Sequence, residues 1–199
     1  MIELDNVAVV VDGMPLFDAV TDRFDDASTT VIEGEVTSAP TTLLRAIAGI
    51  EPFSGSIRID GLDARRARSR LYVCFDDAPV VPYLSGYENV RLLSGRRVST
   101  TSLAAIAPSI ASDALLRRNA RTLSAGERKR IHVVAALASH AANLVFDRAT
   151  SGPDAPTLDE VSSAVAYRSP AATLVVTVDT PTVPEARVRL HQTQDPITS

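Results

Sequence analysis

Lysine is almost absent from this chain of 199 residues. Of its 20 basic residues only Lys129 is a lysine, and all the others are arginines. Glutamine and histidine are also scarce: both glutamines lie in the last eight residues, and the histidines are His132, His140 and His191. These counts exclude any mechanism that needs a lysine, a glutamine or a histidine elsewhere in the chain.

Disulfides, long apolar runs and an excess of positive charge are missing as well. Cys74 is the only cysteine, so no disulfide can form within the chain and a reducing compartment is expected. No apolar run approaches the roughly 18 residues of a membrane span, and the start MIELD is not typical of a signal peptide. The net charge of −4 argues against electrostatic binding of nucleic acid. We therefore expect a cytoplasmic protein that binds no nucleic acid.

The length and the hydrophobic patterns predict one α/β domain, 1–190, followed by a loose polar tail over 191–199. Strand patterns alternate with helical ones, which indicates a largely parallel core. The predicted strands are 2–11, 20–24, 28–32, 56–59, 71–75, 144–146 and 173–178. The predicted helices are 41–48, 65–70, 85–93, 103–116, 124–137 and 157–166. Because no strand pattern occurs over about 76–122, we expect a helical sub-domain there.

A strand, a loop and a helix between residues 28 and 48 have the outline of a phosphate-binding P-loop. Such a loop turns backbone N–H groups toward phosphate, adds a lysine for charge and places a Ser or Thr hydroxyl on magnesium. Gly34, Ser38, Thr41 and Thr42 keep parts of this pattern. Pro40 stands where the lysine is required, and proline offers neither an N–H group nor a charge. The pattern predicts that the architecture persists and that the phosphate site is impaired.

Two further segments carry a resemblance to a known family. LSAGERKR, residues 123–130, begins a helix, and its Ser124 and Glu127 are spaced for a capping box. FDRATSGPD, residues 146–154, follows an apolar strand. In this order and spacing the chain resembles the nucleotide-binding subunit of ATP-binding-cassette (ABC) transporters, from its first residues to Asp179. LSAGE is similar to the family signature LSGGQ, and residues 72–90 are similar to the family's Q-loop and the helix after it.

The resemblance implies a P-loop NTPase-like fold with a small N-terminal antiparallel β part, and it implies ATP and Mg²⁺ as ligands. Asp147 matches the Walker B aspartate, which holds magnesium. Arg148 replaces the glutamate that polarises the attacking water, Asp76 the Q-loop glutamine, and Val178 the switch histidine. Val11 stands near the position of the aromatic side chain that stacks on adenine.

These losses bear directly on catalysis at the chain's own P-loop. Phosphoryl transfer depends on positioning and on charge neutralisation, and the removal of one such group costs about a hundred- to a thousand-fold in rate. With the lysine, the base and the switch residue all replaced, the resemblance implies negligible hydrolysis by this chain alone. Binding of ATP at its own loop is expected to be weak, with Asp147 as a weak magnesium ligand.

The signature is kept where the catalytic groups are lost. In the family, two subunits pack head to tail, and each ATP lies between one P-loop and the signature of the other subunit. Ser124, Ala125, Gly126 and Glu127 would present a hydroxyl, N–H groups and a helix dipole to a partner's γ-phosphate, and Asp154 of the following loop also persists. The resemblance therefore implies a heterodimer with a competent ABC nucleotide-binding subunit. Transmembrane transporter subunits would hold that heterodimer on the cytoplasmic face of the membrane.

Other interpretations of these residues remain open. Ser124 and Glu127 would cap any helix, so the chain can instead be a nucleotide-independent scaffold or regulatory subunit. A third interpretation, slow hydrolysis through altered residues, conflicts with the single lysine. Arg148 can pair with a carboxylate such as Asp147 or Asp154, or it can occupy the phosphate region.

Overall fold

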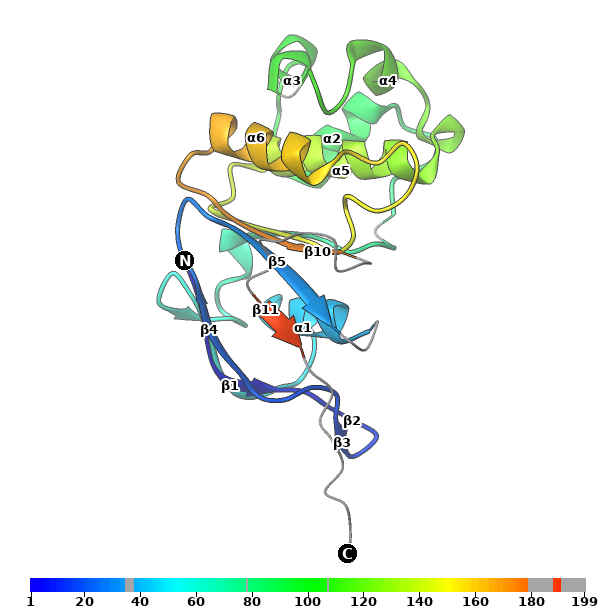
Figure 1. The fold of residues 1–199 in the computed structure, drawn as a ribbon. Helices are drawn as coiled ribbons and strands as arrows, with labels where there is room; N and C mark the ends of the chain where they lie inside the picture. Colours follow the sequence, from blue (N-terminus) through cyan, green and yellow to red (C-terminus); the bar gives the residue numbers. More distant parts are fainter. Residues whose placement is uncertain (35–37, 78, 107, 179–187, 191–199) are drawn as a thin grey trace, which may run out of the picture.

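The computed structural model describes residues 1–34, 38–77, 79–106, 108–178 and 188–190, which form stacked layers of sheets and helices (Figure 1). A four-stranded antiparallel sheet, in the order β4-β1-β6-β7, lies at one end. Its strands are β1 (Ile2–Ala8), β4 (Val20–Phe24), β6 (Ser54–Ile59) and β7 (Leu62–Asp63). A small hairpin of β2 (Val10–Val11) and β3 (Met14–Pro15) follows β1.

A five-stranded parallel sheet, in the order β11-β5-β10-β9-β8, forms the centre. Its strands are β5 (Thr29–Gly34), β8 (Leu71–Cys74), β9 (Asn143–Phe146), β10 (Thr173–Thr177) and β11 (Val188–Leu190). Every residue of β9 and β10 is buried, as expected of strands that are covered on both faces. Because the strands are parallel, their carboxyl ends lie at one edge of the sheet, and this edge holds the predicted site residues.

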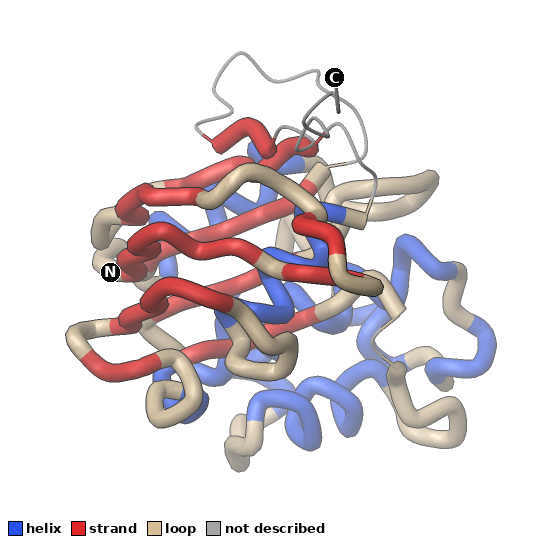
Figure 2. The backbone as a smooth tube through the Cα atoms, turned by 90° about the horizontal axis from the view of Figure 1, so that it is seen from below, coloured by secondary structure: helices blue, strands red, loops and turns tan. Residues whose placement is uncertain are grey.

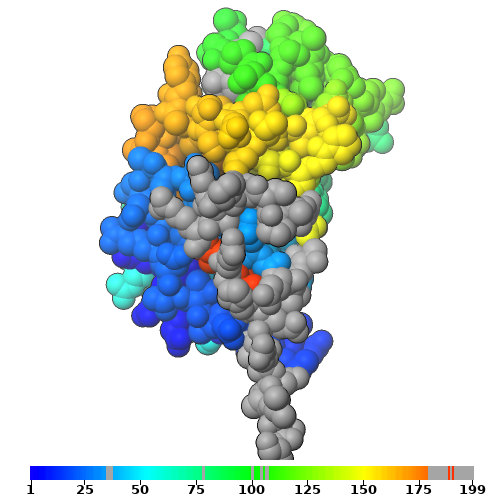
Figure 3. All heavy atoms as spheres, in the orientation of Figure 1, coloured from blue at the N-terminus to red at the C-terminus, as the bar shows by residue number. Residues whose placement is uncertain are grey.

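Helices cover both faces of this parallel sheet. α1 (Ala39–Ile47) lies between it and the antiparallel sheet, and the remaining helices lie on its other face (Figure 1). Those helices are α2 (Gly86–Ser94), α3 (Thr100–Ile106), α4 (Asp113–Arg117), α5 (Ala125–Ser139) and α6 (Leu158–Arg168). Figure 2 looks from the side of the antiparallel sheet, and Figure 3 shows this sheet and the helices α2–α6 at opposite ends of the molecule.

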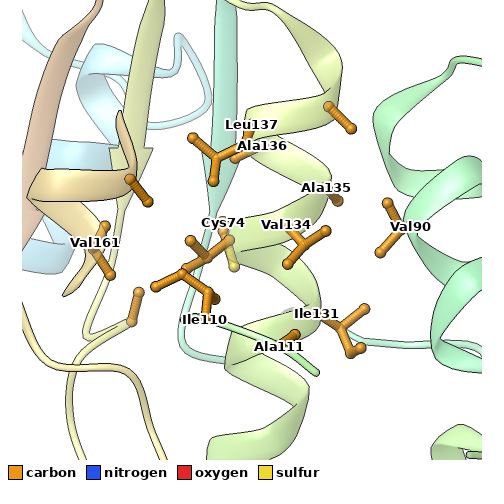
Figure 4. Packing of buried hydrophobic residues seen from close by; sticks show 14 of the residues in the cluster. Cys74, Val90, Ile110, Ala111, Ile131, Val134, Ala135, Ala136, Leu137 and Val161 are labelled. Atoms are coloured by element: carbon orange, nitrogen blue, oxygen red, sulfur yellow. The ribbon is translucent and has the colours of Figure 1, made fainter. Parts of the chain in front are cut away.

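Two hydrophobic cores hold the layers together, one on each face of the parallel sheet. On one face, Leu43, Leu44 and Ile47 of α1 are fully buried among side chains of both sheets. On the other face, α5 lies between α2 and the parallel sheet (Figure 4). Ile131 of α5 lies on the side of α2, whose Val90 is shown opposite it. The buried length of α5 fixes where its first turn, the predicted signature, meets the edge of the sheet.

The mixed α/β class, with its parallel core and its small antiparallel sheet, is confirmed, and two of the predicted helices are wrong. Residues 65–70 form only a short 3-10 turn, η1 (Arg68–Arg70), because Asp63 accepts hydrogen bonds from the N–H groups that follow it and closes a turn there. The predicted helix 103–116 is two short helices, α3 and α4. Ser112 begins the second of these helices, because its side-chain oxygen accepts a hydrogen bond from the N–H of Leu115 over 3.2 Å.

Several strand boundaries also differ from the prediction. β5 continues through Glu33 to Gly34, two residues that were expected in the loop. β1 ends at Ala8 instead of continuing to Val11, and its register shifts where Asn6 has a φ of 51°. The edge strand β11 has no counterpart in the predicted elements. The tail predicted over 191–199 lies outside the described residues.

Among the residues that the structure describes, none of the helices is both long enough and apolar enough to cross a bilayer.

Candidate functional site at the edge of the parallel sheet

Asp147 follows β9 and lies at the centre of the carboxyl edge. The Thr41 hydroxyl donates to its two carboxylate oxygens over 2.9 and 3.0 Å, and the Thr177 hydroxyl donates to Oδ1 over 2.7 Å. The backbone N–H of Asp147 donates to the carbonyl of Cys74 over 2.8 Å, and the residue is only 3% exposed. Hydroxyls from α1 and β10 therefore fix this carboxylate, and they join the predicted P-loop helix to the predicted Walker B strand.

The start of α1 keeps the architecture of a P-loop helix. Ser38 is the N-cap but makes no capping hydrogen bond with its side chain, and Pro40 lies buried in the first turn. Proline is tolerated there because the first N–H groups of a helix have no intrahelical acceptor. The Thr42 hydroxyl donates to the carbonyl of Ser38 over 2.8 Å. Gly34 ends β5 on the other side of residues 35–37, which the structure does not describe.

This edge fits a magnesium ion better than it fits a phosphate chain. The Thr41 hydroxyl and the Asp147 carboxylate are hard oxygen donors within hydrogen-bonding distance of each other, the donor types that Mg²⁺ prefers. ATP also needs a cation at its β- and γ-phosphates, and position 40 supplies a proline instead of a lysine. The described residues therefore fit the metal in part, and position 40 offers no lysine to the nucleotide's phosphates.

Ser124 is the N-cap of α5 and forms the predicted capping box. Its hydroxyl accepts a hydrogen bond from the N–H of Glu127 over 3.1 Å, and Glu127 Oε2 accepts one from the N–H of Ser124 over 2.8 Å. Burial alone would raise the pKa of Glu127, but the hydrogen bond from Ser124 and the guanidinium of Arg118 outweigh burial and lower it. Ala125, the first residue of the helix, is exposed. The first turn of α5 thus exposes the small side chain of Ala125 next to the capping box and to the ion pair of Glu127 with Arg118.

Gly126 is buried against the loop that follows the Walker B strand. A Cβ atom at this position would lie 2.1 Å from the carbonyl oxygen of Pro153 and 2.4 Å from the nitrogen of Ala155. In the same loop, Asp154 has a φ of 62°, and its carbonyl accepts a hydrogen bond from Arg130 Nε over 2.7 Å. Packing alone therefore requires a glycine at this position of the signature, whether or not the turn contacts phosphate.

Lys129 connects α5 to the ends of two strands. Its Nζ atom lies 2.7 Å from Asp76 Oδ1, and it donates to the backbone carbonyls of Arg148 and Ser151 over 2.7 and 2.9 Å. Asp76 follows β8, and its Oδ2 atom lies 3.9 Å from Arg148 Nη1. The structure therefore joins as an ion pair the two residues that the resemblance places at the positions of the Q-loop glutamine and the Walker B glutamate.

These groups border an open cleft of about 660 Å³ between the end of β8, α5 and the loop after β9. Asp76, Lys129, Asp147 and Ser151 all line it, and Cys74 lies on its wall. Burial, with a further contribution from the charge of Asp147, raises the pKa of the Cys74 thiol to about 12. Cys74 is therefore a buried wall residue whose thiol is mostly protonated at neutral pH.

The structure thus divides the predicted residues into two groups. Thr41 and Asp147 meet at the edge of the sheet, whereas Ser124 through Glu127 form the start of α5. Sequence reasoning missed Thr177, whose hydroxyl orients Asp147, and it missed the structural role of Lys129. A threonine at the end of the buried run TLVVT was the available signal for the first. Val11 lies half-exposed in the β2–β3 hairpin, and Val178 packs against the core beneath α5.

Comparison with known proteins gives consistent matches. The family model described as ABC transporter matches residues 18–151. The aliphatic sulfonates import ATP-binding protein SsuB 2 of Burkholderia cenocepacia is 32% identical over 143 residues, which are 69% of this chain and 53% of that protein. The cytochrome c biogenesis ATP-binding export protein CcmA of Xanthomonas axonopodis pv. citri is 29% identical over 187 residues, 88% of this chain and 86% of that protein. The chain thus spans about half the length of the first of these relatives.

The fold has matches among solved structures too. A bacterial ABC transporter cassette, solved as a dimer, superimposes with a TM-score of 0.78 over 96% of this chain and 94% of that chain, at 19% sequence identity. At this identity the match speaks for the fold alone. The family model covers most of the chain, and a relative above 30% identity covers more than two thirds of it. This chain therefore belongs to the ABC transporter family.

Proposed function

We propose that this chain is an ATP-binding-type subunit of an ABC transporter that does not hydrolyse ATP at its own P-loop. In this proposal its signature helix completes the ATP site of a competent partner subunit. The observation that carries the proposal is the contrast between the two ends of the site. Pro40 occupies the lysine position of α1, while Ser124 caps α5 with Ala125 exposed beside it.

Position 40 of the chain's own P-loop supplies no positive charge to a nucleotide, because it is a proline. The only lysine, Lys129, has its three N–H groups directed to one carboxylate and two carbonyls. An ammonium group has three donors, so this lysine has none left for a phosphate. Arg148 replaces the general base, and its guanidinium lies toward Asp76. Hydrolysis at this loop would need both a charge and a base that these residues do not supply.

The signature helix, in contrast, keeps what a γ-phosphate on a partner subunit would contact. The first N–H groups of an α-helix have no intrahelical acceptor, and the helix dipole favours an anion at that end. α5 has 15 residues, and its N-cap serine and exposed alanine leave the approach to this end small and polar. A solved cassette of similar fold is a dimer, which supports an assembly of two subunits. Membrane subunits would hold such a dimer at the membrane.

The experiment has two stages. The tagged chain is purified from its native host in mild detergent, and the proteins that accompany it are identified by mass spectrometry. We expect a second ABC subunit with a complete lysine, glutamate and histidine set, together with membrane subunits. Recovery of this chain alone would overturn the proposal.

The second stage measures ATP hydrolysis by that complex. Ser124→Arg places a long cation at the start of α5, and we expect ATPase activity to fall by about a hundred-fold, as for loss of one transition-state donor. Ser112→Arg, at the N-cap of α4, is the matched control because it also removes a serine cap, and it should leave the activity close to that of the wild type. Equal activity of the two variants would refute the shared site.

A nucleotide-independent scaffold is the second candidate function, and one observation favours it. The capping box of Ser124 and Glu127 and the close packing of Gly126 explain the signature residues without any phosphate. Under this function, Ser124→Arg would lower the stability of the chain by about 1 kcal/mol through the lost cap and would leave the ATPase activity of the complex unchanged.

A further inference from the structure

Lys129 has an acceptor for each of the three hydrogens of its ammonium group. It lies in the second turn of α5, its side chain is 15% exposed, and its Nζ atom meets Asp76 Oδ1 at 2.7 Å. The carbonyls of Arg148 and Ser151 accept its other two hydrogens over 2.7 and 2.9 Å. One side chain therefore ties the signature helix to the segment after β8 and to the loop after β9.

Asp76 also forms an ion pair with Arg148: its second carboxylate oxygen lies 3.9 Å from the Arg148 guanidinium. Arg148 is also fixed through its backbone: its N–H donates to the Thr177 hydroxyl over 3.0 Å, and that hydroxyl donates to Asp147. The result is a closed chain of contacts from α5 through the ends of β8 and β9 to β10.

The favourable charge pairing in this cluster depends on all three residues, because Asp76 pairs with both Lys129 and Arg148. A glutamate at position 148, as the resemblance leads one to expect, would place two carboxylates around one lysine. A glutamine at position 76 would leave Lys129 and Arg148 without the shared carboxylate. With Asp76 and Arg148 in place, the signs alternate as cation, anion, cation, which is favourable at short range in a partly enclosed cleft. The two replacements therefore act together and are more than separate losses.

The loop after β9 is held to α5 along most of its length. Gly126 lies against its residues 153–155, and Arg130 Nε and Nη2 donate to the carbonyls of Asp154 and Ala155 over 2.7 and 3.1 Å. Lys129 holds residues 148 and 151 of the same loop. Displacement of Lys129 would therefore release the part of the loop nearest to Asp76, while the far part stays attached through Arg130.

We propose that Asp76, Lys129 and Arg148 are positioning residues that hold the start of α5 against the edge of the sheet without a nucleotide. The idea rests on the proposed function, in which Ser124 serves a partner's ATP. A chain whose own loop binds ATP only weakly cannot depend on that ATP to orient its signature. The ion network supplies that orientation permanently, so the signature meets the partner's ATP in a fixed position.

The first test uses the isolated chain and hydrogen–deuterium exchange. Lys129→Met removes the charge and all three donors, and Asp76→Asn removes the shared anion with little change of volume. Each should speed amide exchange in peptides from 76–90 and 123–131 by about three- to ten-fold, since a partly buried charged hydrogen bond contributes on the order of 1 kcal/mol. Lys129→Arg keeps a cation and should restore part of the protection.

The control for this test is Arg23→Gln, which breaks an exposed ion pair with Asp25 far from the site. It should leave exchange in both peptides unchanged. If Lys129→Met lowers global stability, exchange is compared at equal distance below each variant's melting temperature, and Asp76→Asn provides a second, milder measurement. Unchanged protection in both Lys129→Met and Asp76→Asn would overturn the positioning role.

The second test measures ATPase kinetics in the complex with the partner. A positioning role predicts that Asp76→Asn lowers kcat by about three- to ten-fold with KM for ATP less affected, because a displaced signature weakens a contact to the γ-phosphate that counts in the transition state. Faster exchange in the isolated chain with an ATPase that is insensitive to Ser124→Arg would support the network and refute the shared site. Unchanged exchange with an ATPase that is sensitive to Ser124→Arg would refute the network and support the shared site.

Discussion

Replacement of Gly126 by alanine tests the packing of the signature helix directly. A Cβ atom at this position would lie 2.1 Å from the Pro153 oxygen and 2.4 Å from the Ala155 nitrogen, and both are backbone atoms. A carbon normally sits about 3.5 Å from such neighbours, so the loop or the helix has to move by more than 1 Å. Insertion of one carbon into a packed site costs about 1–3 kcal/mol, and the upper part of this range, about 2–3 kcal/mol, applies here because the carbon would meet backbone atoms.

Helix propensity acts in the opposite direction. In an open helix position, alanine is more favourable than glycine by about 0.8–1.0 kcal/mol. The net expectation for Gly126→Ala is therefore a loss of about 1–2 kcal/mol of unfolding free energy. For a chain of this size that loss corresponds to a fall of roughly 2–8 °C in Tm. Because propensity alone predicts a rise in Tm, the sign of the change distinguishes the two effects.

Thermal unfolding followed by circular dichroism measures this change. The matched control is Ala125→Gly, at the neighbouring exposed position of the same turn, which should cost no more than about 1 kcal/mol through propensity alone. A Tm for Gly126→Ala equal to or above that of the wild type would refute the close packing of residues 153–155 on α5. It would also return phosphate contact as the leading reason for a glycine at this position.

Two further predictions concern ionisable groups. Because burial raises the pKa of Cys74 to about 12, iodoacetamide at pH 8 should label the folded chain about a thousand-fold more slowly than an ordinary thiol, and labelling at the free rate before unfolding would contradict this burial. The lowered pKa of Glu127 stabilises the fold above its unfolded value near 4.5, and this contribution disappears as the pH falls through the folded pKa. The stability difference between wild type and Glu127→Gln should therefore shrink from pH 7 to pH 3 in urea unfolding, and a constant difference would refute the shift.

The fold could be predicted from the sequence wherever local pattern and tertiary packing agree. The buried runs at 144–146 and 173–178 appear as β9 and β10, because a strand covered on both faces must be apolar throughout. The capping box at Ser124 is formed as predicted, since it depends on four consecutive residues only. The prediction is wrong where a single local hydrogen bond determines the backbone conformation. The predicted helix 65–70 is an example, because the Asp63 side chain accepts a hydrogen bond from the N–H of Arg65 and closes a turn there.

The candidate site could be predicted only in part, for a physical reason. Asp147 and Ser124 lie in short segments whose spacing is visible in the sequence. The ion network of Asp76, Lys129 and Arg148 joins three elements that are far apart along the chain, and its geometry depends on how α5 rests on the sheet. Sequence reasoning therefore identified two of these residues as losses from a family pattern, and the contact between them became visible only in the folded chain.

The position of the single lysine connects the two halves of the proposed function. A lysine at position 40 would serve the chain's own nucleotide, whereas Lys129 holds the helix that would serve another subunit's nucleotide. The two acidic residues differ in a similar way. Asp147 accepts hydrogen bonds from Thr41 and Thr177 at the edge of the sheet, whereas Asp76 pairs with the two cations Lys129 and Arg148. Under the proposed function, the pairing of Asp76 with Lys129 and Arg148 holds the surface that the chain presents to a partner.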